Sequence, residues 1–463
     1  MVNASLKKVI IKNFKSLHDC EIDIGKLNVV VGANASGKSN LVEAFRLLKK
    51  IYVDKDINPF SEWWGYDNVV WQRKEELHVT IGLLFDIEGY DVYYETTSTG
   101  AGGKFQILRE LLDIKGYIRI GKEGEWLNVK HDNNFIEQVI KNLDDYKSGS
   151  GRYYGAKSIL KTEKNQLMKE TKIRVDINKR LLELESIREF HWEGRRLTGK
   201  RTANVFVLSY IYGSRSSQKD EKLKPALTLC PVVYEKSDRY HLEPPLFTIA
   251  SKTIFSAINK LLILYPLNIR SMKVPQPFRR EETLKEDGSN IASVYHTIYL
   301  EEGKIPEEIY DPISMIFPKI EVRPHITEDG RVMIKFFDEG LELLPPNTSD
   351  GFYKILTVLT AIYLKPPLII IDEIENSLHP STLELILDTI GIGQTQAIIT
   401  THSPVVVDMT ELSDIILVEK EQGESKFRRI KDPEKIKEFL IKKGITFSEG
   451  WIYGDLFKTK QLA

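Results

Sequence analysis

Residues 32–39 read Gly-Ala-Asn-Ala-Ser-Gly-Lys-Ser and fit the pattern G-x-x-x-x-G-K-[ST]. Glycines at both ends of such a loop permit backbone angles at which successive N–H groups turn toward a triphosphate. Lys38 would reach the β- and γ-phosphate oxygens, and the Ser39 hydroxyl would bind the Mg²⁺ that bridges them. A plain glycine turn before a helix is the alternative. We expect the nucleotide-binding residues to be Gly32, Asn34, Ala35, Ser36, Gly37, Lys38, Ser39 and Asn40.

Two carboxylates follow an apolar run much later in the chain. Residues 368–371 are Leu-Ile-Ile-Ile, typical of a strand buried on both faces, and Asp372 and Glu373 come directly after them. In a P-loop enzyme the first carboxylate holds Mg²⁺ through water, and the second can orient or deprotonate an attacking water. An acidic turn at the end of a strand is the alternative. Together with the glycine loop, the pair predicts Asp372 as a metal residue and Glu373 as a catalytic residue.

Two further polar positions flank expected core elements. Ser349 and Gly351 precede an apolar helical pattern over 352–363, for which Ser349 is a good N-cap. His402 follows an apolar strand expected over 396–401. Parallel α/β sheets bind ligands at the carboxyl ends of their strands, where both Asp372 and His402 would lie. A structural cap and a structural histidine are the alternatives to a role in the site.

These residues need a sheet and helices to position them. Apolar, β-branched runs predict strands over 9–14 and 27–31, and helical spacing predicts a helix over 40–49 directly after the glycine loop. Alternation predicts further strands over 77–85 and 331–337, which we expect to form a small antiparallel sheet. The order of elements indicates an α/β fold. Trp63 and Trp64 are expected to pack at the base of an insertion.

Composition excludes several classes of protein. The chain has 463 residues, 42% of them hydrophobic and 28% charged, with 65 basic and 66 acidic side chains. These values exclude a wholly disordered or collagen-like chain. No apolar run approaches the ~20 residues of a membrane span, so we expect a cytoplasmic protein with no membrane partner. Two cysteines, Cys20 and Cys230, are too few for a disulfide framework or a C-x-x-C zinc site.

The order of the motifs resembles the ATP-binding-cassette (ABC) ATPases that are not transporters. The closest likeness is to the RecF-like and OLD-like group, which is related to SMC proteins. The resemblance covers roughly the first 90 and the last 180 residues and is specific only as an ordered set. The matching strings are Ile-Lys-Asn-Phe-Lys-Ser at 11–16, the glycine loop, 349–351, 372–380, 400–404, and Gly-Trp-Ile-Tyr-Gly at 450–454.

The resemblance implies an α/β ABC-type P-loop ATPase head that acts as a homodimer. ATP would lie between the glycine loop of one copy and the Ser349 turn of the other. Glu373 would be the catalytic base, His402 the γ-phosphate switch, and residues 376–379 a loop that contacts the opposite site. Gln72 is our candidate for a glutamine that senses Mg²⁺ and water, and a solvent-facing strand glutamine is the alternative.

The same resemblance also marks a departure, because Asp350 stands where transporter cassettes carry glycine. This difference favours the RecF-like and OLD-like group. It leaves the contact geometry at that position open.

A large insertion separates the two halves of the expected site, since 311 positions separate Lys38 from Ser349. Sustained heptads are absent, so a long coiled-coil arm is excluded. Within it, residues 147–201 carry 15 basic and 7 acidic side chains, a formal charge of +8, in a mostly helical pattern. This basic arm could bind DNA or RNA phosphates, while a solvated face or a protein partner are alternatives. We expect three parts: an N-terminal ATPase lobe over 1–100, the insertion and signature lobe over 101–340, and a C-terminal ATPase lobe over 341–463.

The function expected from this reasoning is an ATP-hydrolysing dimeric switch. The family resemblance places it in DNA repair or in defence against mobile DNA. The 61 residues after His402 carry no acidic cluster of the kind that some relatives use for nuclease activity. We therefore expect a separately encoded nuclease or toxin as effector. An ATP-binding scaffold with little turnover is the alternative, and a transporter subunit is disfavoured by the insertion and by Asp350.

Overall fold

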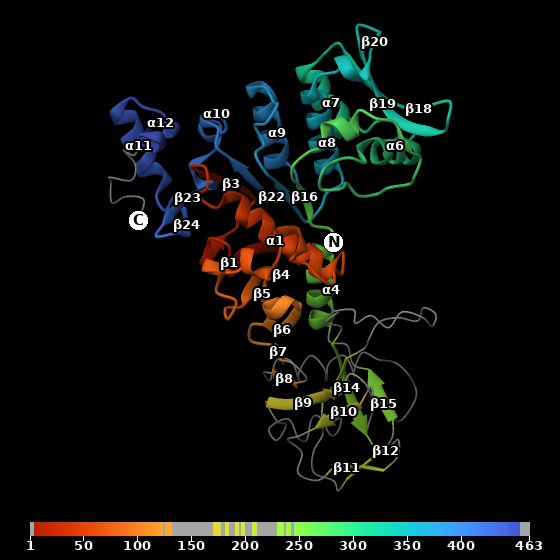
Figure 1. The fold of residues 1–463 in the computed structure, drawn as a ribbon, viewed down its shortest axis with the longest axis vertical. Coiled ribbons are helices and arrows are strands. Elements are labelled where there is room, and N and C mark those ends of the chain that lie inside the picture. Colours follow the sequence, from red (N-terminus) through yellow and green to blue (C-terminus); the bar gives the residue numbers. More distant parts are fainter. Residues whose placement is uncertain are drawn as a thin grey trace. The chain divides into compact units, whose positions relative to one another are not determined.

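In a computed structural model, the described part of the chain divides into two compact units that interleave along the sequence (Figure 1). Unit 1 comprises Met1–Lys15 and Leu47–Asn259, and unit 2 comprises Ser16–Arg46 and Lys260–Ala463. The expected division into three parts stays a prediction. The structure describes residues 4–123, 126–131, 170–176, 181–184, 190–193, 196–199, 206–210, 229–235, 238–241 and 245–453.

Unit 2 is built on a mostly parallel sheet with the strand order β16-β21-β22-β3-β23-β24. Its central strands are continuous apolar runs, and every residue of β3 and β21 is buried, as expected for a parallel sheet covered on both faces. The predicted strands at 27–31, 368–371 and 396–401 are confirmed. The bounds are β3 Leu27–Gly32, β16 Leu262–Leu264, β21 Leu368–Ile371, β22 Gln396–Thr401, β23 Ile415–Glu421 and β24 Glu424–Arg429, with β2 at Leu17–Asp23.

The register of this sheet brings the candidate residues to one edge. Strand β22 pairs in parallel with β21, so that Ile371 lies opposite Ile399, and with β3, so that Val31 lies opposite Thr401. The carboxyl ends of these three strands therefore align. Residues that follow them, 32–39, 372–373 and 402, must leave the sheet at the same edge.

Helices in unit 2 bury their apolar faces in one core with the sheet. Helix α8 contributes several residues to this core, and Leu356 and Leu359 on it are fully buried. The predicted helices at 40–49 and 352–363 are confirmed by α1, which begins in unit 2, and by α8. The bounds are α1 Lys38–Tyr52, α5 Ile269–Met272, α6 Ile291–Glu302, α7 Glu307–Ile316, α8 Asp350–Tyr363, α9 Pro380–Ile392, α10 Pro404–Asp408, α11 Pro433–Lys443 and α12 Phe447–Ile452.

A small antiparallel sheet in unit 2 includes the strand predicted at 331–337. Strand β19 pairs with β17, β18 and β20, and the hairpin between β18 and β19 turns at Gly330, whose φ is 77°. Such a positive φ favours glycine. The bounds are β17 Gln276–Pro277, β18 Ile320–Ile326, β19 Arg331–Asp338 and β20 Leu341–Leu343, with 3₁₀ turns η5 at Pro345–Asn347 and η6 at Leu412–Asp414.

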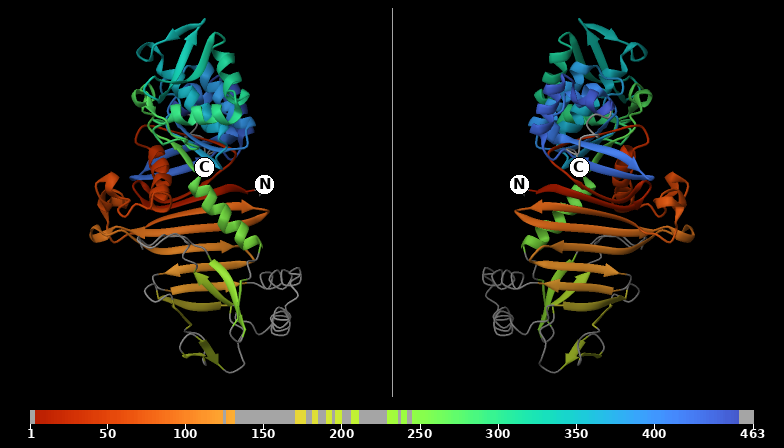
Figure 2. Two further views of the ribbon diagram at one scale, coloured as in Figure 1. Left: turned by 90° about the vertical axis from the view of Figure 1, so that its right-hand side faces the viewer. Right: turned by 90° about the vertical axis from the view of Figure 1, so that its left-hand side faces the viewer.

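Unit 1 contains a long antiparallel sheet in which β10, β9, β8, β7, β6, β5, β4 and β1 follow one another, as Figure 2 shows for its central strands. Strands β1 and β4 confirm those predicted at 9–14 and 77–85. Because β4 belongs to this sheet and β19 to the small sheet of unit 2, the prediction that 77–85 and 331–337 form one small antiparallel sheet is wrong. The bounds are β1 Ala4–Phe14, β4 Val79–Ile87, β5 Tyr90–Thr99, β6 Gln106–Ile114, β7 Ile118–Glu123, β8 Trp126–His131, η1 Ser61–Trp63, η2 Tyr66–Asn68, η3 Trp71–Arg73, η4 Ala101–Gly103 and α4 Pro245–Asn259.

The basic segment 147–201 differs from the helical prediction wherever the structure describes it. Its described parts are strands, and β9 and β10 extend the long sheet of unit 1. In β9 the β-branched residues Thr171, Ile173 and Val175 occupy every second position, a pattern that favours a strand. The rest of 147–201 lies outside the described residues. The strands that the structure describes between residues 170 and 241 are β9 Glu170–Asp176, β10 Leu181–Leu184, β11 Phe190–Glu193, β12 Arg196–Gly199, β13 Phe206–Tyr210, β14 Leu229–Glu235 and β15 Asp238–His241.

The two adjacent tryptophans do not share the expected packing role. Trp63 packs edge-on against Phe14, with ring centroids 6.0 Å apart. Trp64 is 90% exposed and has a left-handed φ of 63°, so the packing prediction is wrong for this residue.

Among the helices that the structure describes, none has both the length and the apolar character to cross a membrane.

The buried sheet of unit 2 predicts a strong contrast between two isoleucines. Ile370 in β21 is fully buried, whereas Ile392 at the end of α9 is 88% exposed. We expect Ile370→Ala to lower the free energy of unfolding by about 2–5 kcal/mol, because it removes buried methyl groups and leaves a cavity. The matched Ile392→Ala change should stay within about 0.5 kcal/mol in the same urea titration. Equal effects would contradict the described packing of β21.

Candidate functional site

The glycine loop between β3 and α1 has the backbone that its sequence requires. Gly37 has a φ of 114° and Ala35 a φ of 61°. A Cβ added to Gly32 would lie 2.5 Å from the carbonyl oxygen of Val418, and one added to Gly37 would overlap the Ser425 side chain. Only glycine therefore fits both positions. The helix that follows begins at Lys38, so its N-terminal N–H groups face the loop, an arrangement suited to phosphate.

Lys38 is held inside its own loop. Its Nζ donates to the carbonyl oxygens of Gly32 at 2.6 Å and Ala33 at 3.1 Å, and the residue is 6% exposed. Burial lowers the pKa of Lys38, and the charge of Asp372 acts in the opposite direction. The ammonium thus lies at the loop with two carbonyl partners that phosphate oxygens could replace.

Ser39 and Asp372 meet across the carboxyl edge of the sheet. The Ser39 hydroxyl donates to Oδ2 of Asp372 at 3.3 Å, and the Thr400 hydroxyl donates to the other carboxylate oxygen. Burial raises the pKa of Asp372, while the hydrogen bond from Thr400 lowers it. A hydroxyl and a partly buried carboxylate are oxygen donors of the kind that Mg²⁺ takes, so the residues present fit this ion. Thr400 was not singled out from the sequence.

Glu373 follows in a left-handed conformation, with a φ of 49°. Its N–H donates to the Thr400 hydroxyl at 2.9 Å, and its Oε2 accepts a hydrogen bond of 2.8 Å from Nδ2 of Asn376. A non-glycine residue in this region of φ costs conformational energy, and such residues cluster at functional sites. The carboxylate of Glu373 is thereby fixed beside Asp372, where a catalytic base would be needed.

His402 is oriented by Glu375, a residue that the sequence reasoning missed. Oε1 of Glu375 accepts from the backbone N–H of His402 at 2.8 Å and lies 2.8 Å from its Nδ1. The Thr401 hydroxyl donates to the second oxygen, Oε2, at 2.8 Å. A carboxylate at Nδ1 favours the proton there, which leaves Nε2 as the ring nitrogen for another partner. The second acidic residue after Asp372 could have been suspected from its place in the same turn.

The turn before α8 is capped as predicted. The Ser349 hydroxyl accepts from the N–H of Gly351 at 3.3 Å. Lys273, which the sequence reasoning also missed, donates to the Thr348 carbonyl at 2.7 Å and pairs with Asp350 at 2.8 Å. Asp350, which stands where transporter cassettes carry glycine, therefore has the Lys273 ammonium beside it. That pairing offsets the negative charge that Asp350 adds to the start of the helix.

A buried lysine links this helix to the carboxylate turn. Nζ of Lys354 donates to the carbonyl oxygens of Asn376 at 2.7 Å and Glu373 at 3.2 Å. Burial lowers the pKa of Lys354 to about 8, although the charges of nearby carboxylates oppose the shift. The only sequence signal was a lysine inside an apolar helical run, which is common on helices and therefore carried no prediction.

The remaining predicted residues are placed as follows. Asn34 and Ala35 are exposed at the tip of the loop, whereas Ser36 is buried and its hydroxyl has no hydrogen-bond partner among the described residues. The side chain of Asn40 donates to the Ser16 hydroxyl at 2.6 Å, at the base of the loop. Gln72 belongs to unit 1, in the 3₁₀ turn η3 rather than in a strand, with a φ of 51°. Its role at the site stays a prediction.

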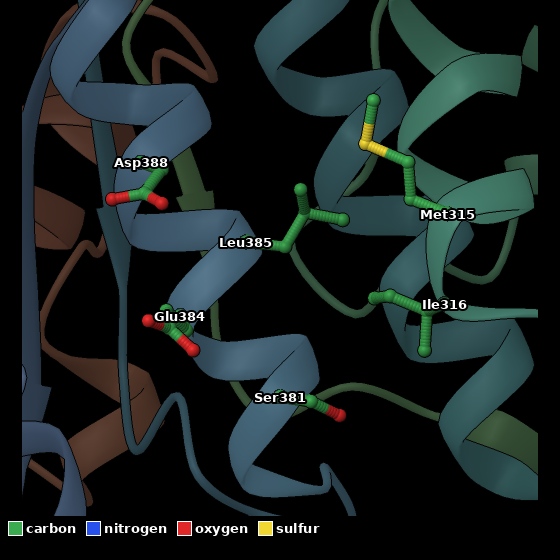
Figure 3. A pocket seen from close by; sticks show the side chains of 6 residues that line it. All are labelled: Met315, Ile316, Ser381, Glu384, Leu385 and Asp388. Carbon is green, nitrogen blue, oxygen red and sulfur yellow. The ribbon is translucent and has the colours of Figure 1, made fainter.

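A separate pocket of about 420 Å³ lies in unit 2 between α7 and α9 (Figure 3). Leu385 of α9 points across it toward Met315 of α7, while Glu384 and Asp388 lie along α9. None of the predicted site residues that the structure describes lines this pocket. The lining residues are Met315, Ile316, Ser381, Glu384, Leu385 and Asp388.

The geometry above agrees with the family to which the sequence is matched. A family model described as "AAA domain, putative AbiEii toxin, Type IV TA system" matches residues 27–408, which is more than half of the chain. The chain belongs to this AAA family. The range starts at the first residue of β3 and includes the glycine loop, the Asp372 turn and His402.

Two curated relatives agree with this assignment. One is structural maintenance of chromosomes protein 3 of Arabidopsis thaliana, 31% identical over 132 residues, which are 27% of this chain and 9% of that protein. The other is DNA replication and repair protein RecF of Lactococcus lactis subsp. cremoris (strain MG1363), 29% identical over 120 residues, which are 25% of this chain and 31% of that protein. The chain thus spans less than a third of the length of either relative. The resemblance stated from the motifs is confirmed, and this AAA family member is an ABC-type P-loop protein related to RecF and SMC proteins.

Solved structures similar to this chain include SMC head domains. The SmcHead bound to the C-winged helix domain of ScpA is 12% identical, with a TM-score of 0.44, over 93% of this chain and 99% of that chain. The SMC head domain from Thermotoga maritima is 14% identical, with a TM-score of 0.40, over 92% of this chain and 99% of that chain.

The buried ammonium of Lys354 predicts a pH-dependent difference in stability. Its pKa in the folded state, about 8, lies below its ordinary value near 10.5, so the unfolded chain binds more protons between these two pH values. The free energy of unfolding of the unsubstituted protein, measured relative to that of Lys354→Met, should therefore rise by about 2 kcal/mol between pH 7 and pH 9.5. Chemical denaturation at both pH values measures this change.

A matched control uses an exposed lysine of the same unit. Lys442 is exposed in α11. The free energy of unfolding of Lys442→Met should differ from that of the unsubstituted protein by the same amount at pH 7 and at pH 9.5. If Lys354→Met behaves in the same way as Lys442→Met, the described burial of the Lys354 ammonium is wrong.

Proposed function

We propose that this AAA family member is an ATP-hydrolysing molecular switch that closes as a homodimer. One observation carries the proposal: the glycine loop, Asp372, Glu373 and His402 all leave the same edge of one parallel sheet. The 3.3 Å contact between Ser39 and Asp372 joins the two halves of this group. Family membership supports nucleotide binding, and the hydrolysis is our inference from the carboxylate pair.

Each residue has a chemical role in this proposal. The N–H groups of the loop and Lys38 would bind the phosphates, and Ser39 and Asp372 would hold Mg²⁺, with Gln72 as a further proposed metal residue. Bound Mg²⁺ would offset the negative charge on the phosphate oxygens. Glu373 would orient or deprotonate the attacking water, and Nε2 of His402 would contact the γ-phosphate.

Dimer formation follows from a second helix N-terminus. The Ser349 hydroxyl and the first N–H groups of α8 form a donor-rich turn, and a second copy of the chain could present this turn to the γ-phosphate. ADP lacks the phosphate that would make this contact. The dimer should therefore be stable with ATP and open after hydrolysis.

The cellular setting is also a proposal. RecF, as its name states, acts in DNA replication and repair, and the family description names an AbiEii toxin and a toxin–antitoxin system. We propose a cytoplasmic role in DNA repair or in defence against mobile DNA, with DNA or RNA bound through segment 147–201. A separately encoded nuclease or toxin would be the effector.

Turnover and dimerisation should separate in two variants. Glu373→Gln is expected to lower the rate of ATP hydrolysis by at least about 100-fold, because it removes the proposed base. It should retain ATP and accumulate as a dimer in analytical ultracentrifugation. Ser349→Arg should bind ATP as a monomer, because the bulky cation occupies the turn that the second copy would present.

Lys38→Ala, which should lose ATP binding, is the reference for these assays. If Glu373→Gln hydrolyses ATP at the original rate while Lys38→Ala loses binding, the chain is an ATP-binding scaffold instead. A dimer that forms equally well with Ser349→Arg would rule out the sandwich arrangement.

Nucleic-acid binding makes a separate prediction. Charge reversal at several basic positions of the arm should weaken DNA or RNA binding and flatten the dependence of log K on log salt. Fluorescence anisotropy at several salt concentrations measures both. Reversal of Lys442 and Lys443 on α11 is the control for a general loss of positive charge. If the arm variants bind nucleic acid as well as the α11 control variants do, the arm has no part in the binding. The arm residues to be reversed are Lys157, Lys161, Lys164, Arg195 and Arg196.

A further inference from the structure

A chain of side-chain hydrogen bonds lies directly beneath the glycine loop. The Ser425 hydroxyl, from β24, donates to the carbonyl oxygen of Ser36 at 2.5 Å. The hydroxyls of Ser425 and Ser16 lie 2.6 Å apart, and Nδ2 of Asn40 donates to the Ser16 hydroxyl at 2.6 Å. We call Ser16 and Ser425 the loop floor. It joins the turn before β2, the strand β24 and the first turn of α1.

The direction of these hydrogen bonds is fixed by proton count. A serine hydroxyl has one proton, and the Ser425 proton goes to the Ser36 carbonyl. Ser16 must then supply the proton between the two hydroxyls, and it accepts from Asn40 on its other side. All three bonds run in one direction, from Asn40 to Ser36. Hydrogen bonds in such a chain polarise and strengthen one another.

The loop floor also contacts the loop sterically. Ser425 is fully buried, and its backbone N–H donates to the carbonyl oxygen of Ser16 at 2.8 Å, which holds the two serines together. A Cβ on Gly37 would overlap Ser425 and come within 3.0 Å of the Ser16 hydroxyl. The backbone of Gly37 therefore lies directly on the floor, and its height above the sheet is set by these two side chains.

Peptide geometry connects this floor to phosphate binding. The Ser36 carbonyl and the Gly37 N–H belong to the same trans peptide, in which C=O and N–H point in opposite directions. Because Ser425 holds the carbonyl toward the floor, the Gly37 N–H is directed away from the floor. An N–H so directed is one of the donors that a glycine loop offers to a phosphate.

We propose that Ser425 and Ser16 are positioning residues for the phosphate loop. They hold the peptide between Ser36 and Gly37 in the orientation that binds nucleotide, although neither hydroxyl need touch the ligand. Ser425 lies far along the chain from the glycine-loop motif, in a strand with no motif of its own. The inference rests on the nucleotide-binding part of the proposed function and is independent of hydrolysis and dimer formation.

The test measures nucleotide affinity separately from stability. We expect Ser425→Ala to raise the Kd for Mg-ADP about tenfold in calorimetry, because it removes the donor to the Ser36 carbonyl. Ser16→Ala should raise the Kd by a smaller factor, because it removes the hydrogen bond that polarises the Ser425 hydroxyl but leaves that donor in place. Ser16→Thr keeps a hydroxyl and should retain the original affinity. The double variant should bind Mg-ADP little more weakly than Ser425→Ala alone, since Ser16 acts on the Ser36 carbonyl only through the Ser425 hydroxyl.

A matched control distinguishes positioning from general stability. Ser448 is likewise buried in unit 2, and its hydroxyl donates to Asp408 at 2.7 Å, away from the glycine loop. Ser448→Ala should lower Tm without changing the Kd for Mg-ADP. If Ser425→Ala and Ser16→Ala fold but bind Mg-ADP as tightly as the unsubstituted protein, the inference is overturned. The inference is also overturned if Ser448→Ala weakens Mg-ADP binding as much as Ser425→Ala does. It is likewise overturned if Ser16→Thr binds Mg-ADP as weakly as Ser16→Ala.

Failure of the underlying assumption gives a different result. Lys38→Ala should lose Mg-ADP binding under the same conditions. If Lys38→Ala binds Mg-ADP normally, the proposed nucleotide site itself is wrong. If Lys38→Ala loses binding while the loop-floor variants do not, only the positioning role is wrong.

Discussion

The candidate site depends on the groups that surround one partly buried carboxylate, that of Asp372. Asp372 emerges from the centre of an apolar sheet, where burial opposes its negative charge. Two hydroxyls, from Ser39 and Thr400, donate to its two oxygens. Ser39 lies in α1, which follows β3, and Thr400 lies in β22, the strand between β21 and β3. The parallel register that aligns the ends of β3, β21 and β22 therefore brings both hydroxyls to this carboxylate. Without it, the first turn of α1 and the acidic turn would have no common edge at which to meet.

Contacts around that carboxylate extend to the helix that begins at Ser349. Lys354 lies on α8 and binds the backbone carbonyls of Glu373 and Asn376, so the helix and the carboxylate turn cannot shift independently without breaking hydrogen bonds. In the proposed dimer, α8 serves the nucleotide of the second copy, whereas Glu373 serves the nucleotide of its own copy. A single buried ammonium would then connect two sites that bind different ATP molecules. Glu375 adds a similar link between this turn and His402.

Sequence reasoning succeeded where one local pattern was sufficient. Strands β21 and β22 were predicted to the residue because continuous apolar runs end sharply at polar groups. The Ser349 cap needed only a serine before an apolar helix. Lys354, Thr400 and Ser425 were missed because their roles depend on residues distant in sequence, which single-residue chemistry cannot reveal. The helical prediction within 147–201 was wrong in its described parts. In β9 the β-branched residues Thr171, Ile173 and Val175 alternate with charged residues, a pattern that favours the strand pairing observed.

The loop floor has a consequence for the biosynthesis of the protein. Translation proceeds from the N-terminus, so the glycine loop emerges from the ribosome before β24, because Ser425 follows Ser36 by 389 positions. The carbonyl of Ser36 acquires its partner only when Ser425 has been added to the growing polypeptide. Nascent chains that carry the complete glycine-loop motif should therefore lack a fully ordered phosphate cradle until β24 has also been synthesised.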